Sequence, residues 1–126
     1  MGRCVFLEKE RKDLPFILHI LEAITNIEES ISTIDKTQFL RNSDAKDANV
    51  RRLEIIDEAV KNISPLLKKK YPDVEWAKIA GTRDKIIHHY FGVNFNLVWE
   101  ILTLNVPQLK QQILRIKAHV GKTEKL

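Results

Sequence analysis

Residues 14–34 read LPFILHILEAITNIEESISTI, and they carry the clearest structural signal in the sequence. Apolar residues recur in this stretch at spacings of three and four: Ile17, Ile20, Leu21, Ile24, Ile27, Ile31 and Ile34. This spacing places them on one face of an α-helix of about 20 residues. Asp13 and Pro15 are residue types that favour a helix start, so we expect the helix to begin beside them.

The following part of the chain is polar and then returns to a helical pattern. Residues 35–49 are mostly polar, which predicts a loop with room for one short turn. A second apolar stripe predicts a helix over residues 50–63: Val50, Leu53, Ile56, Val60 and Ile63. Ser64 and Pro65 end this helix and suit the start of another short turn.

The second half of the chain predicts two more helices. Asp73 can cap a third helix over residues 74–90, which Gly92 ends. A fourth segment begins near residue 97, and Pro107 predicts a kink or a restart within it. Either Asn94 or Asn96 can cap that segment. Its apolar face continues through Leu109, Ile113, Ile116 and Val120.

These segments together predict an all-α fold. No stretch shows the alternation and turn residues of a β-hairpin, and there is no internal repeat. Four main helices with short connections are typical of an antiparallel four-helix bundle, here with an extra short or kinked helix near Pro107. We expect one domain over residues 1–126, with a core over about 14–120 and frayed ends.

Composition narrows the class of protein. The 126 residues include one cysteine, Cys4, which excludes an internal disulfide framework and a thiolate metal site. Charged residues make up 30% and no apolar run reaches the roughly 18 residues of a membrane span. The early charges at the N-terminus do not fit a signal peptide, so we expect a cytoplasmic protein.

The positive charge lies at one end of the sequence. Residues 1–107 hold 16 basic and 16 acidic residues, so the net charge of +4 falls entirely within residues 108–126. Such a segment can bind phosphate, or it can simply be a solvated helix face. A run of three lysines at residues 68–70 leaves the same two interpretations open.

The predicted third helix carries the unusual chemistry. On that helix Arg83 falls within a stripe of apolar and aromatic residues, so it must be paired, extend to solvent or line a cleft. His88 lies about 140° around the helix from Arg83, one turn after Asp84. A site that uses both Arg83 and His88 is therefore easier to build at a two-fold interface.

An arginine and a histidine suit phosphodiester chemistry without a metal. Histidine can move a proton near neutral pH, and a guanidinium can hold phosphoryl charge. RNA supplies its own nucleophile in the 2′-hydroxyl group. The alternative from the spacing alone is a structural helix in which Arg83 forms a buried ion pair with a carboxylate and His88 and His89 lie at the surface. Adjacent residues on a helix diverge by about 100°, so His88 and His89 are a poor metal pair and no metal site is expected.

The motif Arg83-x4-His88-x-Tyr90 resembles the signature of HepT-like toxins, which belong to the HEPN superfamily of small helical nucleases. The likeness extends over about residues 14–116, including Trp76 and Trp99. The chain departs from the family pattern in two places. Asp57 stands where the family usually has Gly, and Asp84 stands where HEPN proteins often have Asn.

The resemblance implies a HEPN-type bundle that forms a homodimer, with two motifs facing one cleft. It implies a metal-independent endoribonuclease that cleaves tRNA or mRNA, with Arg83 and His88 as catalytic residues and Asp84 in support. It also implies the toxin of a type VII-like toxin–antitoxin pair. The antitoxin, an MntA-like minimal nucleotidyltransferase, would use ATP and Mg²⁺ to transfer AMP to Tyr90. RNA cleavage itself would need no cofactor.

Two other functions remain open on the sequence. The chain can be a non-catalytic helical adaptor that helps a nucleotidyltransferase bind its substrate. It can also be a plain structural bundle, in which case changes at Arg83, His88 and Tyr90 alter stability only.

Overall fold

The computed structural model describes the backbone of residues 2–88 and 92–124, and the side chains of residues 12–87 and 92–120. Helices dominate the described chain, and one short hairpin interrupts them. The elements in chain order are α1 (Gly2–Ile31), α2 (Lys36–Arg41), α3 (Ser43–Asn62), α4 (Pro65–Lys70), α5 (Trp76–Ala80), α6 (Thr82–Ile86), β1 (Ile87–His88), β2 (Gly92–Val93), α7 (Phe95–Glu100), the π-helix η1 (Ile101–Asn105) and α8 (Val106–Glu124).

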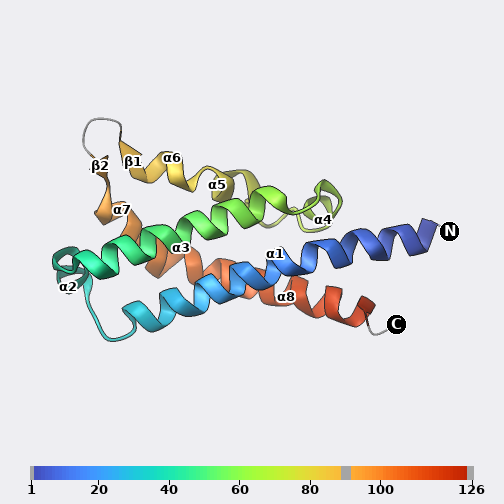
Figure 1. Cartoon of the computed structure of the whole chain (residues 1–126), viewed down its shortest axis with the longest axis horizontal. Coiled ribbons are helices and arrows are strands. Elements are labelled where there is room, and N and C mark those ends of the chain that lie inside the picture. Colours follow the sequence, from blue (N-terminus) through green and yellow to red (C-terminus); the bar gives the residue numbers. More distant parts are fainter. Residues whose placement is uncertain (1, 89–91, 125–126) are drawn as a thin grey trace.

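The described helices form an antiparallel bundle of four rods, which confirms the predicted fold class. The rods are α1, α3, the α5–α6 pair and the continuous α7–η1–α8 segment (Figure 1). Helix α1 packs against both α3 and α8, and α5 and α6 lie along the other side of α3. The β1–β2 hairpin projects at the end of the bundle opposite the start of α1 (Figure 1). None of the helices in the described residues has the length and apolar content to cross a bilayer.

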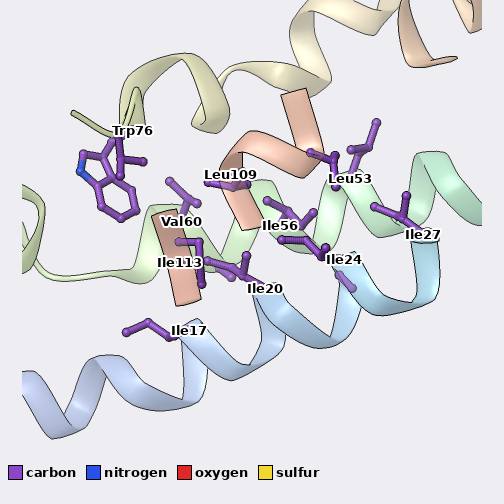
Figure 2. Packing of buried hydrophobic residues seen from close by; sticks show 14 of the residues in the cluster. Ile17, Ile20, Ile24, Ile27, Leu53, Ile56, Val60, Trp76, Leu109 and Ile113 are labelled. Atoms are coloured by element: carbon purple, nitrogen blue, oxygen red, sulfur yellow. The ribbon is translucent and has the colours of Figure 1, made fainter. Parts of the chain in front are cut away.

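The predicted apolar stripes form the core. Isoleucines of α1 face the inner side of α3 and the apolar face of α8, as the close-up in Figure 2 shows. Isoleucines of both α1 and α8 are fully shielded from solvent: Ile17, Ile20, Ile24, Ile27, Ile113 and Ile116 are each 0% exposed. Burial of one such side chain contributes roughly 1.5–3 kcal/mol, which explains why the stripes were a dependable guide to these helices.

The predicted start of the first helix is wrong. Helix α1 extends back to Gly2, and Pro15 lies inside it. Asp13 is 2% exposed and does not cap α1. Its carboxylate instead accepts hydrogen bonds from the backbone N–H (2.8 Å) and the hydroxyl (2.6 Å) of Ser64. Asp13 therefore ties α1 to the α3–α4 junction.

The region predicted as a loop is more ordered than expected. Asp35 and Gln38 form a capping box at the start of α2, and Phe39 of α2 is buried. Helix α3 already begins at Ser43, because Asn42 caps it by accepting a hydrogen bond from the N–H of Ala45 at 3.0 Å. The predicted helix start near residue 50 was therefore seven residues late in a stretch whose outer face is polar.

The predicted helix starts at Ser64 and Asn94 are confirmed, and the helix changes its hydrogen-bond pattern just before Pro107. Ser64 caps α4, and Asn94, rather than Asn96, caps α7 by accepting from the N–H of Leu97 at 3.1 Å. Pro107 follows a π-turn in which the N–H of Val106 donates to Ile101. Proline has no N–H and clashes with the carbonyl four residues earlier, so the wider π-turn accommodates it without ending the rod.

Candidate active site

The predicted third helix is wrong in its boundaries. Its residues form two short helices that divide at Gly81, and α6 ends at Ile86. Asp73 does not cap α5: the N-cap position is Glu75, which makes no side-chain capping bond. The Asp73 carboxylate forms an ion pair with Arg115 of α8. Arg83 and His88 therefore do not lie on one helix: Arg83 belongs to α6 and His88 to β1.

A β-hairpin follows α6, although the sequence predicted none. Ile87 pairs with Val93 and His88 pairs with Gly92 in antiparallel register. Gly92 has a φ of +74°, which side-chain-bearing residues rarely adopt. Strands of two residues are too short to show alternation, so periodicity could not reveal this hairpin.

Arg83 lies on the solvent-exposed face of α6. Within the residues that the structure describes, its guanidinium has no hydrogen bond or ion pair. The buried ion pair that a purely structural helix would need is therefore not observed there. Helix α6 is a separate short helix after Gly81, and the residue that it buries is Ile86 rather than Arg83.

The other motif residues are described less completely. Asp84 is exposed beside Arg83 on α6. His88 is described through its backbone in β1, while His89 and the predicted modification site, Tyr90, lie outside the described residues. The roles of Arg83, Asp84, His88 and Tyr90 stay predictions.

Helix α3 contributes a cation that contacts the first residue of α7. Helix α6 contacts both α3 and α7. The Lys46 ammonium of α3 lies 4.6 Å from the ring centroid of Phe95, the first residue of α7. This cation–π contact holds a positive charge at the start of α7, two residues after the hairpin. Lys46 was not predicted, because a single lysine in a polar stretch does not indicate a functional site.

The basic C-terminal segment is partly neutralised by the fold. Lys110 pairs with Glu28 at 2.9 Å, and Arg115 pairs with Asp73. Both cations therefore link α8 to neighbouring elements. For these two residues, the interpretation as an ordinary helix face is better supported than a free phosphate surface.

Asp57, one of the two residues that depart from the family pattern, is buried in α3 with 3% exposure. One carboxylate oxygen, Oδ1, has no hydrogen-bond partner among the described side chains and lies 3.5 Å from Lys61 Nζ. Among the described residues there is no group of three or more His, Cys, Asp or Glu suited to a metal ion.

Comparison with known proteins places this architecture in a family. A family model described as Ribonuclease HepT-like matches residues 20–116. A Caldanaerobacter subterraneus subsp. tengcongensis protein named as a candidate RNase is 40% identical over 102 residues, which cover 81% of this chain and 91% of the relative. A Thermococcus cleftensis protein named "Probable ribonuclease HepT" is 38% identical over 111 residues, covering 88% of this chain and 99% of the relative.

One further relative is longer than this chain. A Methanocaldococcus jannaschii protein, named as a gamma-glutamylcyclotransferase and candidate RNase, is 42% identical over 117 residues. The match covers 90% of this chain but 52% of that protein, so the chain spans about half of its length. No solved structure matches this chain significantly. The family model and these relatives cover most of the described bundle, and the chain belongs to the HepT-like ribonuclease family.

Proposed function

We propose that this chain is a metal-independent endoribonuclease that cleaves tRNA or mRNA by attack of a 2′-hydroxyl group. The observation that carries the proposal is the exposed Arg83, which has no protein partner among the described residues. A guanidinium without a carboxylate partner is available for a phosphate, with which it forms paired hydrogen bonds. Membership of a ribonuclease family agrees with this use of Arg83.

The reaction assigns one task to each motif residue. His88 accepts the proton from the 2′-hydroxyl, or protonates the leaving 5′-oxygen. The 2′-oxygen bonds to phosphorus as the P–O5′ bond breaks, which leaves a 2′,3′-cyclic phosphate and a 5′-hydroxyl. Arg83 stabilises the charge that develops on the phosphoryl oxygens. Asp84, beside Arg83 on α6, orients either Arg83 or His88.

The working unit in this proposal is a homodimer. One chain offers one Arg83 and one His88, while proton transfer to and from two oxygens needs an acid and a base. A two-fold axis beside α6 would bring two copies of the motif to one cleft. The exposure of Arg83 and Asp84 leaves this face of α6 free to meet RNA and a second copy.

The proposed biological role is that of a toxin in the cytoplasm, silenced by modification. An MntA-like minimal nucleotidyltransferase would use ATP and Mg²⁺ to add AMP to Tyr90. The phosphate of the added AMP would bind Arg83 in place of RNA, and the nucleotide would block the cleft. RNA cleavage itself would use no cofactor.

Cleavage of purified tRNA and mRNA in the presence of EDTA tests the proposal. Arg83→Ala and His88→Ala should each lower the rate by about a hundredfold or more, as loss of a catalytic group does. Lys85→Ala is the matched control, because Lys85 is another exposed cation of α6. Equal rates for the wild type and His88→Ala would refute the assignment. A wild type that cuts no RNA but binds a nucleotidyltransferase would support the adaptor function instead.

A further inference from the structure

A groove opens between α5–α6 on one side and η1–α8 on the other. Its floor is apolar and includes Leu53 and Ile56 of α3, whose side chains also border the core (Figure 2). Its rim carries Thr82 at the start of α6 and the amide side chains of Asn105, Gln108 and Gln112. The groove has a volume of about 190 Å³ and is open to solvent along one side.

The amides on the rim have unused hydrogen-bonding capacity. Within the described part of the chain, the side chains of Asn105 and Gln108 make no hydrogen bond to protein. Gln112 donates one bond, from Nε2 to the carbonyl oxygen of Asp73 at 3.2 Å. A side-chain amide both donates and accepts, so it can bind two adjacent groups on the edge of a heterocycle.

The groove is close to neutral overall. Its two carboxylates are each matched by a cation: Asp73 pairs with Arg115, and Glu75 pairs with Lys78 at 3.2 Å. A free anion would gain little here, and a cation would find carboxylates that are already paired. The lining therefore favours a neutral ligand with an apolar face and a polar edge.

The size and position of the groove narrow the choice of ligand. About 190 Å³ is below the roughly 300–1,000 Å³ of pockets that enclose drug-sized ligands, so a single heterocycle fits better than a whole nucleotide. Thr82, on the rim, is the residue next to Arg83. A base in the groove would thus lie one position along α6 from the residue that the proposed reaction places at the phosphate.

We infer that the groove is a subsite for one unstacked nucleobase of the RNA substrate, next to the phosphate that is cleaved. Proteins usually read single-stranded RNA by splaying bases out and bonding to their edges. Here Asn105 and Gln108 would bond to the base edge while Ile56 and Leu109 contact its face. The inference rests on the proposed ribonuclease function, and it gives that function a base preference.

The first test measures base preference with an RNA library randomised around the cleavage site. The wild type should prefer one or two bases at a single position. The double variant Asn105→Ala/Gln108→Ala should lose that preference to within about twofold, with kcat/KM on the best RNA reduced about tenfold, the effect of lost hydrogen bonds. Gln111→Ala is the matched control, because Gln111 is an exposed glutamine of α8 outside the groove. An unchanged preference in the double variant would overturn the inference and leave the ribonuclease function intact.

The second test does not depend on cleavage. Adenosine, guanosine, cytidine and uridine are each titrated into the isotope-labelled protein, and amide NMR shifts are followed. At least one nucleoside should shift residues around Ile79 and Leu109 saturably in the wild type and in Gln111→Ala, but not in the double variant. If none of the four does so, the groove is not a base subsite, whether or not the protein cuts RNA.

Sedimentation velocity tests whether a second copy of the chain, rather than a base, occupies the groove. Leu104, which precedes Asn105 of the groove in η1, is 65% exposed, so a second copy of the chain is the competing occupant. The inference expects the double variant and the wild type to sediment alike. A double variant that dissociates would assign the groove to a subunit interface and overturn the base subsite.

Discussion

The backbone N–H of Asn94 donates a 2.7 Å hydrogen bond to the carbonyl oxygen of Ile86. Ile86 is the last residue of α6, and Asn94 also caps α7 through its side chain. The hydrogen bond thus closes the hairpin that contains His88 and fixes it to the helix that carries Arg83. We therefore expect this closure to influence how His88 lies relative to Arg83.

Gly92→Ala should weaken the closure without creating a clash. The φ of +74° costs a residue with a Cβ atom about 1–2 kcal/mol, although a Cβ at this position would meet nothing within 4 Å. We expect RNA cleavage to fall several-fold and the melting temperature to fall by only a few degrees, because Ile87 and Val93 of the hairpin are only partly buried against the core.

Gly81→Ala is the matched control for Gly92→Ala. Its φ of −104° suits any residue, and an added Cβ would meet the carbonyl oxygen of Ala77 at an ordinary 3.5 Å. This variant should keep its activity and its stability. Equal losses of activity in both variants would show that the positive φ of Gly92 is not the cause.

Asp13→Ala should destabilise the whole bundle. It removes two hydrogen bonds to a buried carboxylate and leaves the N–H of Ser64 without its partner. Charge-assisted bonds of this kind contribute about 1.5–3 kcal/mol, so we expect the free energy of unfolding in urea to fall by about 2–3 kcal/mol. Asp13→Asn, which still accepts hydrogen bonds, should lose less.

The pairing of Asp13 with Ser64 can be isolated by a double-mutant cycle. Ser64→Ala also removes the α4 cap, in which the Ser64 hydroxyl accepts a hydrogen bond from the N–H of Leu67. The loss of stability in this single variant therefore combines two contacts. In the cycle we expect a coupling energy of about 1 kcal/mol or more between Asp13 and Ser64. Strict additivity would mean that Asp13 acts through other residues.

Asp57 and Lys61 should respond asymmetrically to substitution. Asp57→Ala removes a buried carboxylate whose Oδ1 has no hydrogen bond, so stability should stay the same or rise. Lys61→Met leaves that carboxylate without a cation and should cost about 1 kcal/mol, a modest value because the Lys61 side chain is 52% exposed. In the Asp57→Ala background, Lys61→Met should have no effect on unfolding in urea. A loss of stability in Asp57→Ala as large as that in Asp13→Ala would contradict this account.

The sequence predicted the helices that bury a stripe better than it predicted their ends. Helix cores follow from apolar spacing, which is a local property, and most residues of the stripes of α1, α3 and α8 are buried. The ends depend on long-range partners. Asp13 resembled a cap, but its carboxylate binds Ser64, 51 residues away. Asp73 also resembled a cap, but its carboxylate pairs with Arg115.

The candidate site was the part of the structure that the spacing of residues along the sequence predicted least well. The spacing over residues 74–90 fits one amphipathic helix, yet Gly81 and the hairpin divide that stretch. The motif residues themselves were found by resemblance, which does not depend on the helix. The groove could not be found in this way, because Thr82 and Gln108 come from separate rods and meet only in the folded bundle.

The chain has two tyrosines, Tyr71 and Tyr90, and this makes the proposed modification site simple to test. Incubated with an MntA-like nucleotidyltransferase, ATP and Mg²⁺, the wild type should gain AMP and lose RNA cleavage. Tyr90→Phe should gain no AMP and stay active, since phenylalanine differs from tyrosine only in lacking the oxygen that would accept AMP. Tyr71→Phe is the control and should be modified and silenced like the wild type. Peptide mass spectrometry locates the AMP, and cleavage of tRNA in EDTA reads the activity. AMP on Tyr71, or a Tyr90→Phe variant that is still silenced, would assign the control of this ribonuclease to another residue.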